Sequence, residues 1–420
     1  MIRNIFKSFL RKESSSPRAS MQDGGILISN SQDLENYLRG LGAETQSGAV
    51  VTPQSALQRA VVHRCVSIIA GSVANMPLQL KRRVDDRTRE DASDHSLSRI
   101  LTRKPNRWMT PSAFRRLLTL HVLLRGNGYA LIVRSMGKII ELIPLHPDRV
   151  SIKQIDDFSI KYTYTRKDGR QVEFPQSEIF HLMGMSLDGV RGVSVLECAR
   201  ESIGLSAQAQ NHSAAIFKNG ATMGAVLKHP KMLSNEARDA LRSSMDNFRG
   251  AENAYKTLVL EEGLDIEKLT MTAEDMAFID TAKMTRADIG MFFGVPPHLY
   301  GDTEKTTSFG SGIEHQSLGF VAYTMEDWLT AWEQTIDRDL IGDADPQLFS
   351  RFNRAALVRG DIKTRWAAHK DALQWGVCSP NEIREIEDLN PREGGDIYYD
   401  PPNTAGTPQG ERSDELEKTA

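Results

Sequence analysis

The segment from Gly301 to Gly312 is the most distinctive polar stretch of this 420-residue chain. It follows Gly294-Val295-Pro296-Pro297, where a helix should end because proline lacks an amide donor and clashes with the preceding turn. The segment has three glycines and no hydrophobic stripe, so it should project as a loop. Its chemistry is hydroxyl-rich and nearly neutral, since its single base is offset by two acids that precede it. The residues concerned are Asp302, Thr303, Glu304, Lys305, Thr306, Thr307, Ser308 and Phe309.

The sequence lacks the motifs of common catalytic and cofactor sites. It contains no GxxxxGK[ST] phosphate loop, no HExxH and no cysteine–histidine cluster. Gly310-Ser311-Gly312 lacks the flanks of a GxSxG elbow, and Gly126-Asn127-Gly128 lacks the third glycine of a dinucleotide fingerprint. Glu261 and Glu262 lie at a predicted turn, where solvated acids are ordinary, so a catalytic carboxylate pair is disfavoured. We therefore expect no enzyme activity, no metal and no cofactor.

Composition narrows the classes further. The formal charge of -3 argues against a protein that coats nucleic acid through bulk positive charge, although a neutral surface could still let DNA slide. The three cysteines, Cys65, Cys198 and Cys378, are odd in number and far apart, which favours neither a disulfide framework nor a zinc site. No run approaches the roughly 18 apolar residues of a membrane span. A reducing, cytoplasmic compartment is the simplest interpretation.

The two ends of the chain differ from its centre. Met1–Lys12 has one apolar face and several bases, so it is either an arm that docks on a partner or membrane surface or a frayed terminus. Residues Glu13–Gln54 are rich in Ser, Gly and Gln and should be loose. Asn381–Ala420 has a net charge of -7, whereas Lys81–Arg116 has a net charge of +6. This polarity could orient partners or belong to solvated faces.

The first part of the chain predicts a mixed α+β module. Helices are expected from Ala56 to Val73 and after Thr110-Pro111, with the proline suited to the first turn. Met136-Gly137-Lys138 and Lys167-Asp168-Gly169 should each close a β-hairpin. The expected strands are Leu78–Leu80, Tyr129–Val133, Ile139–Ile143, Lys161–Thr165, Val172–Phe174 and Ile179–Leu182.

Two further helices should bracket a compact insert. Ser194 and Glu197 predict a capping box that opens a helix to Lys218, and Thr272 opens the helix that ends near Phe293. The first of these helices has small residues on several faces, so it is either buried in its own core or packed against copies of itself. The insert should contain strands at Gly224–Leu227, Thr257–Leu260 and Leu264–Ile266, and a helix from Ser234 to Gly250.

The last structured part should be mainly helical. A long helix is expected from Ile313 to about Ile341, with Trp328 and Trp332 as core anchors. A strand at Leu348–Phe352 and two short helices, Asp361–Trp375 and Asn381–Leu389, should follow. Beyond Pro401-Pro402 the polar chain is expected to be disordered.

Short motifs in a fixed order carry a family resemblance. They are Arg64–Ala70, Arg125–Ala130, Leu142–Leu145, Gly189–Leu196, Phe217–Ala221, Phe292–Leu299, Leu357–Asp361, Asn381–Arg384 and Gly394–Asp396. Each motif is weak alone, but the ordered set is specific. Over roughly Ala56 to Asp396 the chain resembles the portal (head–tail connector) proteins of tailed bacteriophages, in the branch of long-tailed phages and prophages.

The resemblance implies an α+β portal-protein fold assembled as a ring, with a mixed α/β wing, a helical stem, a small α/β clip and a helical crown. The implied division is a flexible N-terminal arm (1–55), the first part of the wing (56–193), a stem helix (194–219), the clip (220–271), a second stem helix (272–295), a tunnel loop (296–312), the long wing helix and strand (313–358), the crown (359–400) and a disordered tail (401–420).

The implied function is a channel at one capsid vertex through which double-stranded DNA is packaged and ejected. The ring would hold roughly a dozen subunits joined by heterologous contacts. Asp302–Phe309 would line the channel without reading DNA sequence, and the clip would meet its partners through Lys228, His229, Arg238 and Arg242. Implied partners are the terminase large subunit, the major capsid protein and head–tail connector or adaptor proteins. The particle would assemble in the host cytoplasm. A non-channel scaffold or adaptor of the phage head is the alternative, and a nucleic-acid enzyme is a third, more distant hypothesis.

Overall fold

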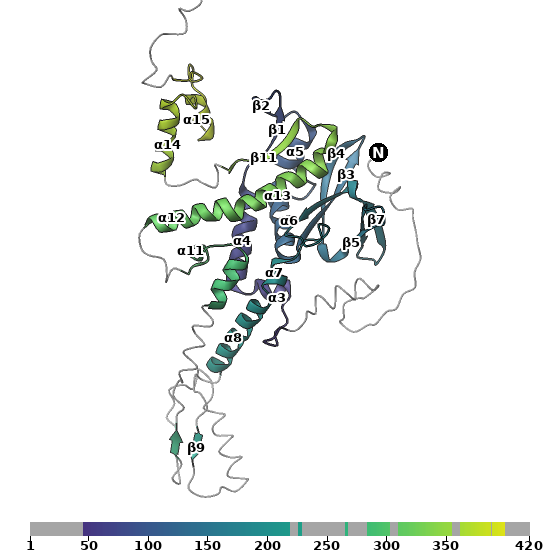
Figure 1. Ribbon diagram of the computed structural model, residues 1–420, viewed down its shortest axis with the longest axis vertical. Helices are drawn as coiled ribbons and strands as arrows, with labels where there is room; N and C mark the ends of the chain where they lie inside the picture. Colours follow the sequence, from purple (N-terminus) through teal and green to yellow (C-terminus); the bar gives the residue numbers. More distant parts are fainter. Residues whose placement is uncertain are drawn as a thin grey trace, which may run out of the picture. The chain divides into compact units, whose positions relative to one another are not determined.

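A computed structural model describes residues 45–218, 226–228, 265–267, 284–302, 310–354, 362–387 and 389–399. The chain divides into two compact units, Met1–Asn353 and Arg354–Ala420, and each is considered by itself (Figure 1). The predicted amphipathic arm Met1–Lys12 and the tail from 401 to 420 lie outside the described residues, as does the predicted helix from Ser234 to Gly250.

Several helices of the first unit begin at a capping side chain. Thr52 and Ser55 form a capping box for α3 (Pro53–Leu57), and the chain becomes extended at Arg59 before α4 (Ala60–Asn75). Of the helix predicted from Ala56 to Val73, the part from Ala60 onward is confirmed as α4, whereas Ala56 and Leu57 belong to the separate helix α3. α6 (Pro111–Arg125) starts as predicted with Thr110 as its cap and ends at the left-handed Gly126.

A buried arginine ties three of these helices together. The guanidinium of Arg115 on α6 donates to the carbonyl of Leu101 at 3.4 Å, near the end of α5 (Ser96–Thr102). It also donates to the carbonyls of Ala74 and Met76 at the end of α4, at 2.7 and 3.2 Å. Helix C-termini leave such carbonyls unpaired, so one side chain satisfies several of them. Burial lowers the pKa of Arg115 to about 10, which leaves it charged at neutral pH.

The described part of this unit contains three three-stranded antiparallel sheets and one two-stranded sheet. Both predicted hairpins are present: β3 pairs with β4 around Met136 and Gly137, which both have positive φ, and β6 pairs with β7. β3 also pairs with β8, and β1 pairs with β11 from the far end of the unit. The three-stranded sheets are β4-β3-β8 (Lys138–Leu145, Asn127–Ser135, Ile179–Met183), β5-β6-β7 (Val150–Gln154, Ile160–Thr165, Gln171–Pro175) and β11-β1-β2 (Leu348–Phe352, Leu78–Arg83, Arg89–Asp91).

A buried histidine joins two of these sheets. His181 on β8 contacts the Tyr162 hydroxyl on β6 through Nδ1 at 3.1 Å and the Asn127 Oδ1 on β3 through Nε2 at 3.0 Å. Since that amide oxygen also accepts from the Gly192 N–H, Nε2 carries the proton and Nδ1 accepts from Tyr162. Burial lowers the pKa of His181 to about 3, so the ring is neutral.

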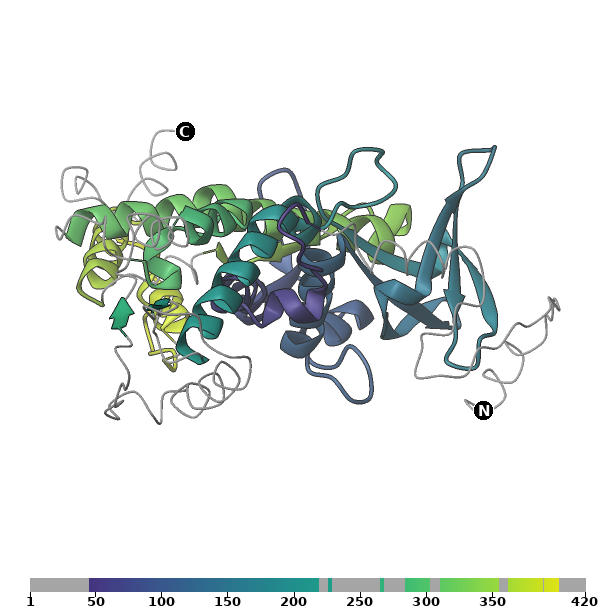
Figure 2. The ribbon, with the colours of Figure 1, turned by 90° about the horizontal axis from the view of Figure 1, so that it is seen from below.

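The long helix of the first unit is continuous but not uniform. α12 (Gly310–Gly319) runs into the π-helical segment η4 (Phe320–Met325), then α13 (Glu326–Ile336) and a second π-helical segment, η5 (Asp337–Ile341). Figures 1 and 2 show these segments, in green, as one rod. The predicted helix is confirmed, although it begins at Gly310 rather than Ile313.

The first predicted stem helix is broken. Ser194 caps α7 (Val195–Cys198), which ends at Ala199 before α8 (Arg200–Lys218) begins. The predicted capping box with Glu197 is wrong: the Ser194 hydroxyl accepts from the Leu196 N–H and donates to the Leu124 carbonyl at 2.8 Å. Beyond α8, β9 (Val226–Lys228) pairs antiparallel with β10 (Asp265–Glu267), where the sequence predicts strands.

The second unit is a small helical hairpin. α14 (Ile362–Gln374) is followed by α15 (Pro380–Ile386), which starts in a capping box between Ser379 and Glu382. Glu387 then accepts from the side chains of Arg365 and His369 on α14, at 3.0 and 2.9 Å. Both helices predicted here are confirmed.

Candidate functional site

The candidate site is the base of the loop Gly301–Gly312, because both chain segments that lead into the loop are described. Of the predicted loop residues, the side chains of Thr303 to Phe309 lie outside the described residues, and only Asp302 is placed, half-buried. The predicted clip residues His229, Arg238 and Arg242 also lie outside them. Lys228 is placed only as a strand residue, opposite Asp265.

The segment that enters the loop is shaped by glycines and prolines. The helix over 284–292 ends because Gly294 adopts a left-handed φ of 65°, and Val295 donates its N–H to the Gly290 carbonyl at 3.0 Å. This end is where the sequence predicts it. One further turn, α11 (Pro297–Tyr300), was not predicted, and Gly301 caps it with a φ of 93°. The chain therefore turns twice before the loop.

Close packing holds this segment to the helix behind it. A Cβ at Gly290 would lie 2.5 Å from the ring of Tyr300, so only glycine lets α11 fold back there. Arg64 on α4 donates through Nε to the Leu299 carbonyl at 3.0 Å. Thr324 in η4 donates to the Gly294 carbonyl at 2.7 Å. The entering segment is thus tied to α4 and to the long helix.

A histidine joins the two sides of the loop directly. His298 on α11 contacts the Gln316 Oε1 through Nδ1 and the Ser317 hydroxyl through Nε2, both at 3.0 Å. Because the amide oxygen can only accept, Nδ1 donates to Gln316, and Nε2 shares its hydrogen bond with the Ser317 hydroxyl. We call these three residues the His298 clasp. Sequence reasoning missed the clasp because its members are separated by the whole loop.

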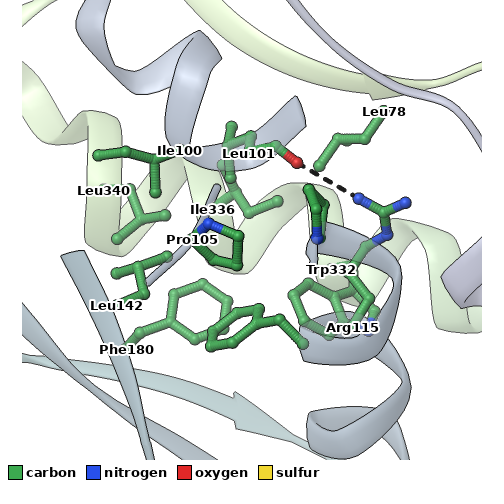
Figure 3. A pocket seen from close by; sticks show the side chains of 12 residues that line it. Leu78, Ile100, Leu101, Pro105, Arg115, Leu142, Phe180, Trp332, Ile336 and Leu340 are labelled. Carbon is green, nitrogen blue, oxygen red and sulfur yellow. Dashed lines mark hydrogen bonds between the residues drawn. The ribbon is translucent and has the colours of Figure 1, made fainter. Parts of the chain in front are cut away.

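The far end of the long helix is fixed in the core of the first unit. Trp332 is 2% exposed, packs against Phe180 and donates from Nε1 to the Thr119 hydroxyl at 3.1 Å. Figure 3 shows its surroundings, where Leu142, Ile336 and other apolar side chains converge and leave no room for a small-molecule ligand. The prediction of Trp332 as a core anchor is confirmed, whereas Trp328 is only half-buried.

Two acidic residues of the long helix bind the neighbouring edge strand, β11. Glu333 is 4% exposed and accepts from the Phe352 N–H at 2.7 Å and from Arg351 at 3.1 Å. Asp337 accepts from the N–H and the hydroxyl of Ser350, both at 2.8 Å. Burial raises the pKa of Asp337, while the two bonds from Ser350 act in the opposite direction. The loop therefore leads into a long helix whose far end is held in place by both apolar and polar contacts.

No three His, Cys, Asp or Glu side chains gather to hold a metal in the part of the chain that the structure describes. None of the helices described there is long and apolar enough to cross a membrane.

Comparison with known proteins places this architecture in a family. Residues 60–388 match the profile of the phage portal protein family. The chain belongs to the phage portal protein family. It is 34% identical to the portal protein of Enterobacteria phage HK97 over 352 residues, which are 83% of this chain and 82% of that one. It is 32% identical to the probable portal protein of Streptomyces phage phiC31 over 375 residues, 84% and 80% of the two chains.

A solved structure supports the same portal fold. A chain from the neck of an empty GTA particle matches with a TM-score of 0.58 and 25% identity, over 81% of this chain and 94% of that chain. The predicted portal-protein fold and family are therefore confirmed. Its role is that of a portal, the channel of DNA packaging, and its place is the virion. The portal family is a structural rather than an enzymatic one.

Proposed function

We propose that the loop 301–312 is the tunnel loop of a ring of roughly twelve subunits and forms the narrowest part of its channel. The observation that carries the proposal is the base of the loop, which is anchored on both sides. The His298 clasp joins α11 to α12, and the Thr324 hydroxyl ties η4 to the Gly294 carbonyl. Repeated around a ring, such a base would hold each loop at one height along the channel.

The chemistry of the loop suits a duplex that must pass. DNA carries about one negative charge per 1.7 Å of axis, so a ring of many lysines would bind it and slow it. Lys305 is the only base between Gly301 and Gly312, and Asp302 and Glu304 offset it. Hydroxyl side chains supply weak contacts that water can replace. The loop would therefore touch DNA of any sequence without retaining it.

The remaining parts take the roles that the family order suggests. In this proposal 56–193 and 313–358 form the wing, 194–219 and 272–295 the stem, 220–271 the clip and 359–400 the crown. Lys228, His229, Arg238 and Arg242 of the clip would contact the terminase large subunit. Because this chain lacks a phosphate loop, ATP hydrolysis would be the task of that separate motor. The major capsid protein and the head–tail connector proteins would be further partners, and assembly would occur in the host cytoplasm.

Cross-linking to packaged DNA tests the loop assignment. Cysteines at Thr306 and Thr307, in a Cys198→Ser background, should cross-link to DNA in filled particles when they carry a short photoactivatable reagent. A cysteine at Met136, which is 95% exposed at the turn of β3 and β4, is the matched control. Labelling at the loop no better than at Met136 would contradict the assignment. Electron microscopy of the purified chain tests the ring separately.

A further inference from the structure

The second unit exposes far more apolar surface than a stable unit of its size can leave in water. Eight large hydrophobic side chains in its described part are each 46% to 69% exposed, and Ile383 is the only hydrophobic residue there that is buried. The eight are Trp366, Trp375, Val377, Ile386, Leu389, Ile397, Tyr398 and Tyr399. Contiguous exposed apolar surface of this kind marks an interface.

Polar contacts, rather than a core, give this unit its shape. Asn381 donates to the Arg392 carbonyl at 3.0 Å and to Asp396 at 2.8 Å, and its Oδ1 accepts from the Arg392 N–H. The Tyr398 hydroxyl donates to Glu382 at 2.7 Å. Small units seldom hold together on such contacts alone, because they need buried apolar surface as well. Something outside the unit must cover its hydrophobic residues.

The exposed residues form two separate edges. A Cβ at Gly376 would lie 2.3 Å from the Tyr399 carbonyl oxygen, so the turn after α14 touches the C-terminal segment of the unit. This contact brings together one group, the tyrosine edge: Trp375, Val377, Ile397, Tyr398 and Tyr399.

The other group lies across the hairpin. Ile386 precedes Glu387, which binds Arg365 and His369 on either side of Trp366, and the Trp366 and His369 rings meet edge to face at 5.7 Å. We call Trp366, Ile386 and Leu389 the leucine edge. Trp366 and Trp375 are nine residues apart, which is about two and a half helical turns. The Trp375 N–H still bonds to the Asp371 carbonyl, so the two tryptophans point to opposite sides of α14.

We propose that the tyrosine edge of one copy packs against the leucine edge of the next copy in the ring. Two different patches on opposite sides are what a heterologous contact needs, whereas a two-fold dimer uses one patch twice. This inference rests on the proposed ring and assigns one of its subunit contacts.

The available area sets the strength of the contact. Large hydrophobic side chains bury about 150–250 Å² each, so eight that are half exposed offer roughly 800 Å². A stable interface buries about 1,600 Å² in total, so this contact would supply about half of one. The contact should therefore strengthen a ring that other surfaces also hold, and losing it should weaken the ring without abolishing it.

Cysteine cross-linking of the full chain tests the pairing directly. Cys378 lies next to Val377 on the tyrosine edge, and Ile386→Cys would place a partner on the leucine edge. In a Cys198→Ser background, a short bifunctional reagent should give a ladder of covalent oligomers only when both cysteines are present. Dimers from Cys378 alone would indicate a two-fold contact and overturn the proposal. Rings that form without any cross-link would show that something else covers the edges.

Substitutions give an independent measurement. Val377→Asp and Trp366→Ala should each raise the subunit concentration at which rings dissociate by about tenfold, as measured by mass photometry. Met136→Asp, at a fully exposed turn of the first unit, should leave it unchanged. An equal effect of all three variants, or no effect of the first two, would refute the inference. Absence of rings in the unsubstituted chain would instead refute the proposed ring itself.

Discussion

Removing the His298 clasp should loosen the base of the loop while the rest of the unit stays folded. His298→Ala deletes two side-chain hydrogen bonds, one to the exposed Gln316 and one to the partly buried Ser317. A net value of about 1 kcal/mol for the buried bond and about half of that for the exposed one gives about 1.5 kcal/mol. Because about 1.4 kcal/mol is a factor of ten, local opening should become about tenfold more frequent.

Hydrogen exchange followed by mass spectrometry measures this opening. Amides of 299–302 and of α12 should exchange about tenfold faster in His298→Ala, and those of β3 should not change. His63→Ala is the matched control, since the His63 side chain is exposed on α4 and makes no hydrogen bond or ion pair in the part of the chain that the structure describes. Unchanged exchange at the loop base, or equal acceleration in β3, would refute the reasoning.

Coupling between the clasp members can be tested in the same way. Gln316→Ala should accelerate amide hydrogen exchange at the loop base in the natural chain. In the His298→Ala variant the same substitution should have a smaller effect, because the bond between the two side chains is already lost. The difference should be about 0.5 kcal/mol, the interaction energy expected of residues in contact. Strictly additive effects would show that the two side chains act independently.

Three further outcomes follow from the core of the first unit. Gly192→Ala should lower the free energy of unfolding in urea by about 3 kcal/mol or more, because its Cβ would lie 2.0 Å from a backbone oxygen. Gly71→Ala is the control: it has open space on α4 and should raise the free energy of unfolding by about 1 kcal/mol. Trp332→Phe should cost about 2 kcal/mol in the same assay, since a buried threonine hydroxyl loses its partner. Burial lowers the pKa of His121 to about 4 and that of His181 to about 3. Below about pH 6.5, the usual pKa of a histidine, the unfolded chain therefore binds more protons than the folded chain. The free energy of unfolding should be highest above that pH and should fall by about 1 kcal/mol per histidine by pH 5.5. A urea midpoint that does not change with pH would contradict this.

Local signals made much of the fold predictable. The hairpin at Met136 and Gly137 is specified by its glycine, which adopts positive φ without strain, and α15 by a serine followed by proline and a glutamate three residues later. The long helix was predictable because its apolar residues, Trp332 among them, repeat with the period of a buried helix face. Each of these signals lies within a few residues of the structure it specifies.

What the sequence did not predict depends on distant partners. Ser194 has the residue type of a capping box, but the carbonyl of Leu124, 70 positions earlier, takes its hydroxyl and the helix breaks at Ala199. The pairing of β1 with β11 joins strands some 270 residues apart, and no local pattern specifies that register. The His298 clasp is of the same kind, because the residues it joins meet only after the loop between them has closed.

The long helix also has a mechanical consequence. From Gly310 to Ile341 it extends on the order of 45 Å, with one end at the loop and the other gripped by Trp332, Glu333 and Asp337. The helix therefore acts as a lever that is fixed at one end. A force applied at the loop end would be transmitted to the sheets that pack around Trp332. The lever is not uniform, since π-helical turns bond less favourably than α-helical ones. Of its two π-helical segments, η4 is the one nearer the loop, and the hydrogen bond from Thr324 to the Gly294 carbonyl supports the helix there.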